Sequence, residues 1–301
     1  SVDHRVHWAY ERLYAQVQAA AFMPATEYAH GALDMDELLP RCGEYPPDYG
    51  KPDPDPLKFA PREAMPTMTW HRQILFVKDQ DPKGPNYFVV RDAFGGKPAK
   101  PTDDTFWFLA NDMTRDGDVF HFDGQLPVDM DVFVNSPAGA RPETGKFGHV
   151  QQPYARMTGD DLRYYPNKVR REDQLFLRLQ QPAGGGYCVV LYPRLKGIDP
   201  PATYTSLGEH AVKVVTPLST DYLLLNAFPA SAKADDVDIT GTAVAVRKYA
   251  DGKIVVTNSE GAAAVTIAGT TITGAGPFSV TLAGGKVETK TYSADATVEV
   301  R

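Results

Sequence analysis

The chain has 301 residues and a mass of 33.0 kDa, a length that suits one large β domain or two ordinary domains. With 43% hydrophobic and 23% charged residues, its composition is globular and excludes wholesale disorder. A net charge of −7 argues against nucleic acid or an anionic membrane surface as the main partner. No apolar run approaches the roughly 20 residues that a membrane helix needs, so we expect no membrane span.

The first 66 residues are predicted to form a short helix and an extended connector. The chain opens at Ser1 with no initiator Met and no signal-peptide pattern, so we expect either a removed precursor segment or an excised piece, and favour the former. Apolar residues recur at about helical spacing over 8–17, and Pro24 ends that pattern. The Pro-dense segment 40–66 favours an extended surface connector over the alternative, a calcium site in its PDPDP run.

Short apolar runs dominate the rest of the chain, and Gly, Pro and Asp separate them as in a many-stranded β fold. Strands are predicted at 74–77, 87–90, 105–109, 119–122, 128–134, 174–180, 187–192, 211–216 and 222–226. From about residue 235, Ala, Gly, Thr and Val prevail, and Asp251-Gly252 marks a hairpin turn. We therefore predict an all-β fold: an antiparallel β-sandwich at 67–232, after the helix and connector of 1–66, and a small β-rich module at 233–301.

One block of the sequence resembles a known family. Residues 69–94, TWHRQILFVKDQDPKGPNYFVVRDAF, resemble the strand pair that opens the β-sandwich of heparinase II/III-type polysaccharide lyases. FWFLA (106–110), FHFDGQ (120–125), VDMDVFV (128–134) and the tail segment 252–277 are similar to later strands of that sandwich. The likeness spans roughly 65–285, and only the 69–94 block is specific. In that family the glycan lies between the sandwich and a helical toroid, which carries most of the catalytic side chains.

The resemblance implies a function for the chain as the sandwich part of a lyase. Such an enzyme cleaves a uronate-containing acidic polysaccharide by β-elimination, which needs a base, an acid and a group that neutralises the carboxylate. A toroid would then come from a partner chain or a precursor segment, and the protein would be secreted, periplasmic or on the cell surface. The alternative is a non-catalytic extracellular protein that uses the same sandwich for glycan binding or assembly, since strand edges in its tail could pair into a homo-oligomer.

His71 and Asp92 lie near the ends of two consecutive predicted strands, which antiparallel pairing would bring together. Imidazole and carboxylate suit zinc when a third ligand joins them. By resemblance the two positions match a metal-binding His and Asp of the family, and His121 is the available third ligand, unless Trp107 takes that place and the ligand is lost. The alternatives are a structural hydrogen-bonded pair, or His71 as the catalytic base on the sandwich side.

A Tyr- and Arg-rich stretch covers residues 154–171. Aromatic faces stack on sugar rings and guanidinium groups bind carboxylates in a forked geometry. The stretch is therefore predicted to bind the acidic glycan, and an ordinary polar loop or a subunit contact is the alternative. The residues chosen for this role are Tyr154, Arg156, Arg163, Tyr164 and Tyr165.

The remaining polar residues give weaker signals. Asp129 and Asp131 share one face of a predicted strand, and solvent exposure is favoured over acid–base chemistry or a calcium site. No CxxC, GxSxG, P-loop or Rossmann glycine pattern occurs, which argues against a zinc ribbon, a serine hydrolase or a nucleotide cofactor. Whether Cys42 and Cys188 form a disulfide is left open. Five histidines without neighbours at ligand spacing are predicted to be surface or satisfied core residues: His4, His7, His30, His149 and His210.

Overall fold

The structure, a computed structural model, describes residues 16–34, 68–79, 81, 84–96, 102–135, 141–149, 172–182 and 185–301. This part of the chain is all-β, and its strand pairs are antiparallel. The predicted all-β, antiparallel fold is confirmed. Within the described ranges no helix has the length and apolar character to cross a membrane.

The predicted N-terminal helix is wrong where the structure describes it. Residues 16 and 17 open a strand, β1 (Gln16–Phe22), which pairs with the next strand, β2 (Thr26–Asp34). Residues 8–15, most of the predicted helix, lie outside the described residues. Pairing with β2 satisfies the backbone groups of β1, and this tertiary contact outweighs a short helical pattern.

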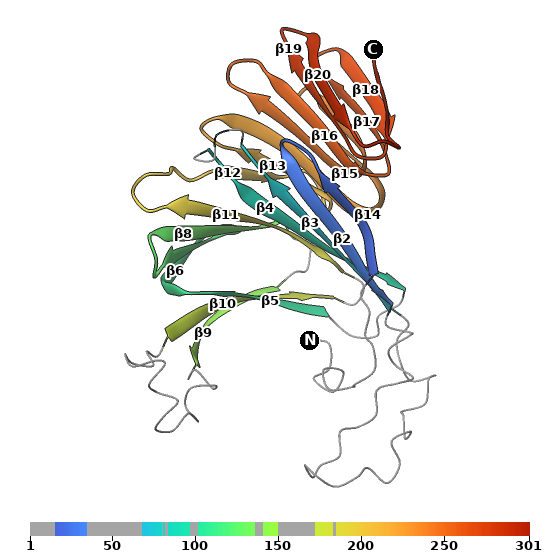
Figure 1. The fold of residues 1–301 in the computed structure, drawn as a ribbon. Coiled ribbons are helices and arrows are strands. Elements are labelled where there is room, and N and C mark those ends of the chain that lie inside the picture. The colour runs from blue at the N-terminus through green and yellow to red at the C-terminus, as the bar shows by residue number, and fades with distance from the viewer. Residues whose placement is uncertain are drawn as a thin grey trace, which may run out of the picture.

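Eight strands form sheet A in the order β1-β2-β3-β4-β11-β8-β7-β6 (Figure 1). Besides β1 and β2, its members are β3 (Met68–Val77), β4 (Tyr87–Gly96), β6 (Ala110–Asp116), β7 (Val119–Gly124), β8 (Val128–Asn135) and β11 (Tyr187–Leu195). Three strands form sheet B: β5 (Thr102–Phe108), β10 (Glu172–Gln181) and β9 (Arg141–His149). Only Leu109 separates β5 of sheet B from β6 of sheet A.

Ten strands form sheet C. They are β12 (Thr203–Ser206), β13 (Ala211–Val215), β14 (Ser219–Ala234), β15 (Val237–Tyr249), β16 (Ile254–Glu260), β17 (Ala262–Ile267), β18 (Thr270–Ala275), β19 (Phe278–Ala283), β20 (Lys286–Tyr292) and β21 (Thr297–Val300). β15 pairs with β17 through its first residues and with β16 through its last, so the sheet divides along this strand. The predicted boundary at residue 233 falls at the end of β14, inside sheet C.

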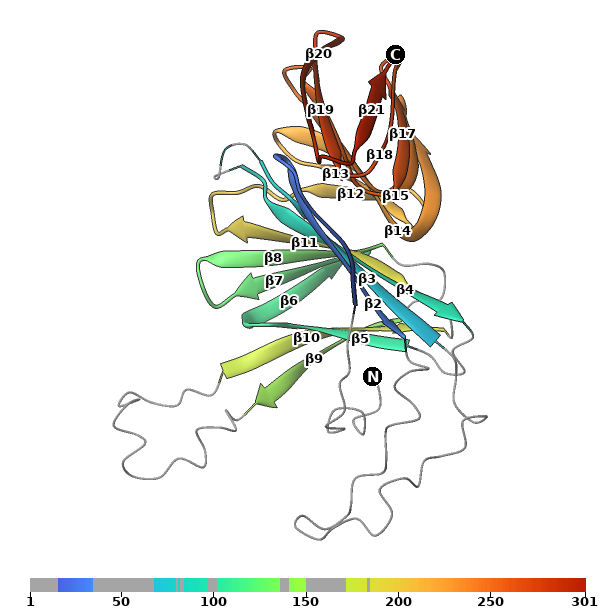
Figure 2. The same ribbon diagram turned by 45° about the vertical axis from the view of Figure 1, so that its right-hand side comes forward.

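The sheets lie in layers with sheet A in the middle, as the two views agree (Figures 1 and 2). One apolar cluster joins sheets A and C and includes Leu75, Val190 and Leu223. A second joins the other face of sheet A to sheet B and includes Phe120, Phe122 and Leu177. The period-2 alternation of strands explains this division, because neighbouring residues point to opposite layers. A third apolar cluster lies within sheet C, where strands of that sheet pack against one another.

Candidate functional site

The layer between sheets A and C becomes polar toward one end. Its core includes a cross-strand row of five apolar or aromatic residues, namely Tyr28, Leu75, Val89, Val190 and Phe133. Two residues further along each strand, on the same face, the row is instead His30, Gln73, Arg91, Cys188 and Asn135. All five of these side chains are buried. Buried polar groups need partners, so this row is where chemistry or specific binding is expected.

A hydrogen-bonded chain of side chains starts in this row and crosses from sheet A to sheet C. Glu260, at the end of β16, forms hydrogen bonds with Nδ1 of His30 at 3.0 Å and with the Tyr28 hydroxyl at 2.5 Å. Nε2 of His30 lies 3.1 Å from Nδ1 of His71 on the neighbouring strand β3. Gln73 donates to the Tyr28 oxygen at 2.8 Å. The chain Glu260–His30–His71 therefore leads from a carboxylate to a half-buried imidazole.

The surroundings shift the pKa of three groups in this chain. Burial alone would raise the pKa of Glu260, but the hydrogen bonds from His30 and Tyr28 outweigh it and lower that pKa. Burial, together with the neighbouring His30, lowers the pKa of His71. Burial and the Glu260 carboxylate raise the pKa of Tyr28 far above its usual value. At neutral pH the chain thus holds an ionised Glu260, a neutral His71 and a protonated Tyr28.

These protonation states are consistent with one particular tautomer of each histidine. An ionised carboxylate only accepts hydrogen bonds, so Nδ1 of His30 carries the proton. In the arrangement where His30 carries only this one proton, its Nε2 is an acceptor, and Nδ1 of His71 donates to it. The lone pair of His71 is left on Nε2, to which no described residue donates a hydrogen bond. The arrangement supplies an imidazole base held in one tautomer, as a carboxylate holds the histidine of a catalytic triad.

A β-bulge places an aromatic side chain beside this base. The register of β14 with β15 shifts between Leu225 and Ala230, and the intervening residues leave the ladder. Gln73 donates to the Asn226 carbonyl at 3.1 Å, and the Asn226 amide donates to the Phe228 carbonyl at 2.8 Å. The Phe228 ring meets the His71 ring edge-on at 5.8 Å and remains 59% exposed. The bulge therefore re-aims Phe228 toward the site, a common role of bulges near functional sites.

The three predicted metal ligands do not come together. β3 and β4 pair antiparallel as expected, but Arg72 faces Asp92 and His71 faces Ala93, so His71 and Asp92 lie on opposite faces of sheet A. Asp92 instead accepts hydrogen bonds from Nε and Nη2 of Arg72, at 2.8 and 2.7 Å. No group of three His, Cys, Asp or Glu side chains suited to a metal occurs among the residues that the structure describes. Zinc or calcium binding by this set stays a prediction without support from the geometry.

His121 has a separate structural partner. Its side chain points away from Phe120 and Phe122, and its Nδ1 lies 2.8 Å from the Asp131 carboxylate. Asp131 also accepts a hydrogen bond from Nε of Arg194 at 2.6 Å. The expectation of a solvated Asp131 is wrong, because this carboxylate is fully buried. The Arg194 guanidinium compensates its charge and His121 adds a hydrogen bond, which accounts for the burial of Asp131.

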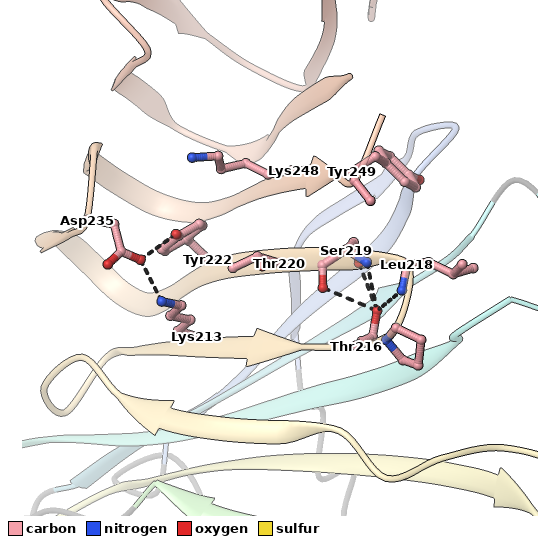
Figure 3. A pocket seen from close by; sticks show the side chains of 11 residues that line it. Lys213, Thr216, Leu218, Ser219, Thr220, Tyr222, Asp235, Lys248 and Tyr249 are labelled. Carbon is pink, nitrogen blue, oxygen red and sulfur yellow. Dashed lines mark hydrogen bonds and ion pairs between the residues drawn. The ribbon is translucent and has the colours of Figure 1, made fainter. Parts of the chain in front are cut away.

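A hollow of about 420 Å³ opens on sheet C beside the turn between β13 and β14 (Figure 3). Asp235 accepts hydrogen bonds there from Lys213 and the Tyr222 hydroxyl, both at 2.6 Å. The second lysine of the lining, Lys248, pairs with Asp236. Both lysine charges are thus offset by carboxylates, and the hollow offers little net attraction to an acidic glycan.

Sequence reasoning identified His71 but not its partners. His30 was expected to be a surface or satisfied core residue; it is buried and hydrogen-bonded, with Glu260 230 residues away along the chain. The five Tyr and Arg residues predicted to bind glycan, Tyr154, Arg156, Arg163, Tyr164 and Tyr165, lie outside the described residues, as do Cys42, His4 and His7. Cys188 is a buried free thiol, and burial raises its pKa to about 11.

No protein-family model and no curated protein matches the chain.

Proposed function

We propose that the chain is the β-sandwich part of a heparinase II/III-like polysaccharide lyase that acts on a uronate-containing acidic polysaccharide. Sheets A and C would be the two layers of that sandwich. The observation that carries the proposal is the chain Glu260–His30–His71, which presents an unprotonated imidazole nitrogen at neutral pH. A toroid from a partner chain or a precursor segment would close the site, and an extracellular or periplasmic location would follow from the substrate.

In the proposed reaction Nε2 of His71 removes the proton from C5 of the uronate. The electron pair of that C–H bond forms a C4–C5 double bond, and the C4–O bond breaks with its electrons on the leaving oxygen, which is then protonated. The His71 imidazolium is stabilised through His30 by the Glu260 carboxylate. His71 is thus the catalytic base, and His30, Glu260 and Tyr28 are positioning residues. Tyr28 is engaged with Glu260 and holds its proton too tightly to act as the acid.

Replacing His71 tests the proposal. The native gene product is expected to release unsaturated uronate products from a panel of uronate polymers, measured as new ultraviolet absorbance. His71→Ala should reduce this rate by about 10²–10⁴-fold, the usual contribution of a general base. His121→Ala is the matched control, because that histidine contacts Asp131 and not the proposed base. Equal rates for His71→Ala and the native protein would refute the assignment.

Phe228 is assigned the role of a platform for the sugar ring. An exposed aromatic ring next to a base can stack on the C–H face of a pyranose and hold it at the reacting distance. Phe228→Ala should raise KM at least about 10-fold, and Phe228→Trp should restore it, with little change in the melting temperature because the ring is exposed. A KM unchanged by Phe228→Ala would remove this role.

The alternative proposal is a non-catalytic glycan-binding or assembly protein. It is favoured by β20, an edge strand of sheet C whose seven residues are all exposed. Retention of a glycan, or growth into larger assemblies, without any unsaturated product would support it. If neither product nor retention appeared on the panel, both proposals would fail.

A further inference from the structure

Arg91 is a buried cation without an anionic partner. It lies in the polar row of sheet A, on β4, and is 4% exposed. Its Nη2 contacts Nδ1 of His210 at 3.2 Å, while Nε and Nη1 are both buried and make no hydrogen bond. The guanidinium therefore keeps two sets of N–H groups available in a space that solvent does not reach.

No described carboxylate forms an ion pair with this charge. Asp92, the next residue, points to the other face of sheet A and is held by Arg72. Glu209 is exposed and forms no ion pair with Arg91 within the described ranges. Burial lowers the pKa of the Arg91 guanidinium more than the charges of Glu209 and Asp92 raise it. An uncompensated buried charge is among the most unfavourable features a fold can carry.

A buried side chain beside Arg91 also carries an unpaired polar atom. Gln73 lies directly across from it on β3, with an unpaired Oε1. A side chain at Gly186 would come within 3.1 Å of Nη1 of Arg91, so the chain segment that leads into β11 runs directly beside the guanidinium. A water molecule could bridge Gln73 and Arg91, but water is neutral and leaves the charge uncompensated.

We propose that Arg91 binds an oxyanion, a carboxylate or a phosphate group, through its unpaired Nε and Nη1 groups. The planar guanidinium fork matches two oxygens of such a group, and a partly buried site makes these charge-assisted hydrogen bonds strong. His210 is half-buried and contacts only one nitrogen of the fork, so the anion is expected to enter past it. The proposal stands independently of lyase activity, since it concerns binding alone.

Thermal unfolding of the full chain in different sodium salts tests the proposal. At pH 7 and constant ionic strength, acetate, glucuronate or phosphate replaces chloride in a titration series. The expected result is a rise in Tm of about 2–4 °C for each tenfold increase in the anion concentration above its Kd. A response to acetate and glucuronate alone indicates a carboxylate site, and a response to phosphate alone indicates a phosphate site.

Variants show whether Arg91 is responsible. Arg91→Met keeps the length of the side chain and should abolish the response, while in chloride its Tm should equal or exceed that of the native chain because the unpaired charge is gone. Lys233→Gln, which removes an exposed cation, should respond like the native chain. The proposal is overturned if the native chain melts identically in all salts, which is the result expected for a water-filled site, or if Arg91→Met still responds. If Arg91→Met does not fold, calorimetric titration of the native chain and of Arg91→Lys decides, with binding to the native chain required.

Discussion

Glu260→Gln is expected to lower the proposed lyase activity by about 10²–10⁴-fold, although Glu260 does not touch the substrate. The glutamine amide can donate to Nδ1 of His30, which moves the His30 proton to Nε2. His30 then donates to Nδ1 of His71, and the proton of His71 is displaced to Nε2, the atom proposed to act as the base. The substitution thus reverses both tautomers while the side-chain shape is nearly unchanged.

The pH profile separates this effect from a merely structural one. The native rate should fall as the pH drops through the pKa of His71, which burial and His30 place below 6.5. The Glu260 charge raises the pKa of His71, so Glu260→Gln should move this acidic limb to still lower pH. Glu288→Gln, an exposed site on β20, should leave rate and profile unchanged. A Glu260→Gln protein with native rate and an unshifted limb would contradict the relay.

Asp221→Asn is expected to destabilise the fold by about 3–5 kcal/mol, the largest stability effect we predict for a single polar residue. Asp221 is fully buried. Its carboxylate accepts hydrogen bonds from Nε and Nη2 of Arg247 at 2.9 and 2.8 Å, and from the Tyr87 hydroxyl at 2.5 Å. Arg247 also donates to the Lys78 carbonyl at 2.8 Å, which ties β15 of sheet C to the end of β3 in sheet A. Loss of the carboxylate leaves a buried guanidinium with only a weak second contact, Asp79 at 3.4 Å.

Urea unfolding measures this loss as a lower midpoint at unchanged slope. Asp238→Asn is the control, since its partner Lys233 is exposed and the pair should contribute less than about 1 kcal/mol. Replacing both Asp221 and Arg247 by apolar residues should recover much of the stability, because no unpaired charge is then left in the layer. A midpoint for Asp221→Asn equal to that of Asp238→Asn would show that this ion pair does not hold the two sheets together.

The strands with strong local patterns were predictable, and the weaker ones were not. Each of the nine strands predicted between 74 and 226 coincides with a strand of the structure to within one residue at its end, because their apolar and β-branched residues mark a buried face locally. β2 (Thr26–Asp34) and β6 (Ala110–Asp116) were missed, since polar residues interrupt both and their position in sheet A comes from their neighbours. The helical pattern before Pro24 failed at residues 16 and 17 for the same reason, because pairing with β2 decided their conformation.

The sequence by itself determined the all-β class and the antiparallel hairpin of β3 and β4. These features depend on neighbours within about 25 residues, which a local pattern can encode. Only the tertiary structure decided that His71 and Asp92 face opposite layers, that Glu260 reaches His30 across 230 residues, and that Arg91 is buried without a carboxylate. A one-residue change of register reverses which side chains meet, and burial depends on the sheet that packs above, so neither can be inferred from spacing along the chain.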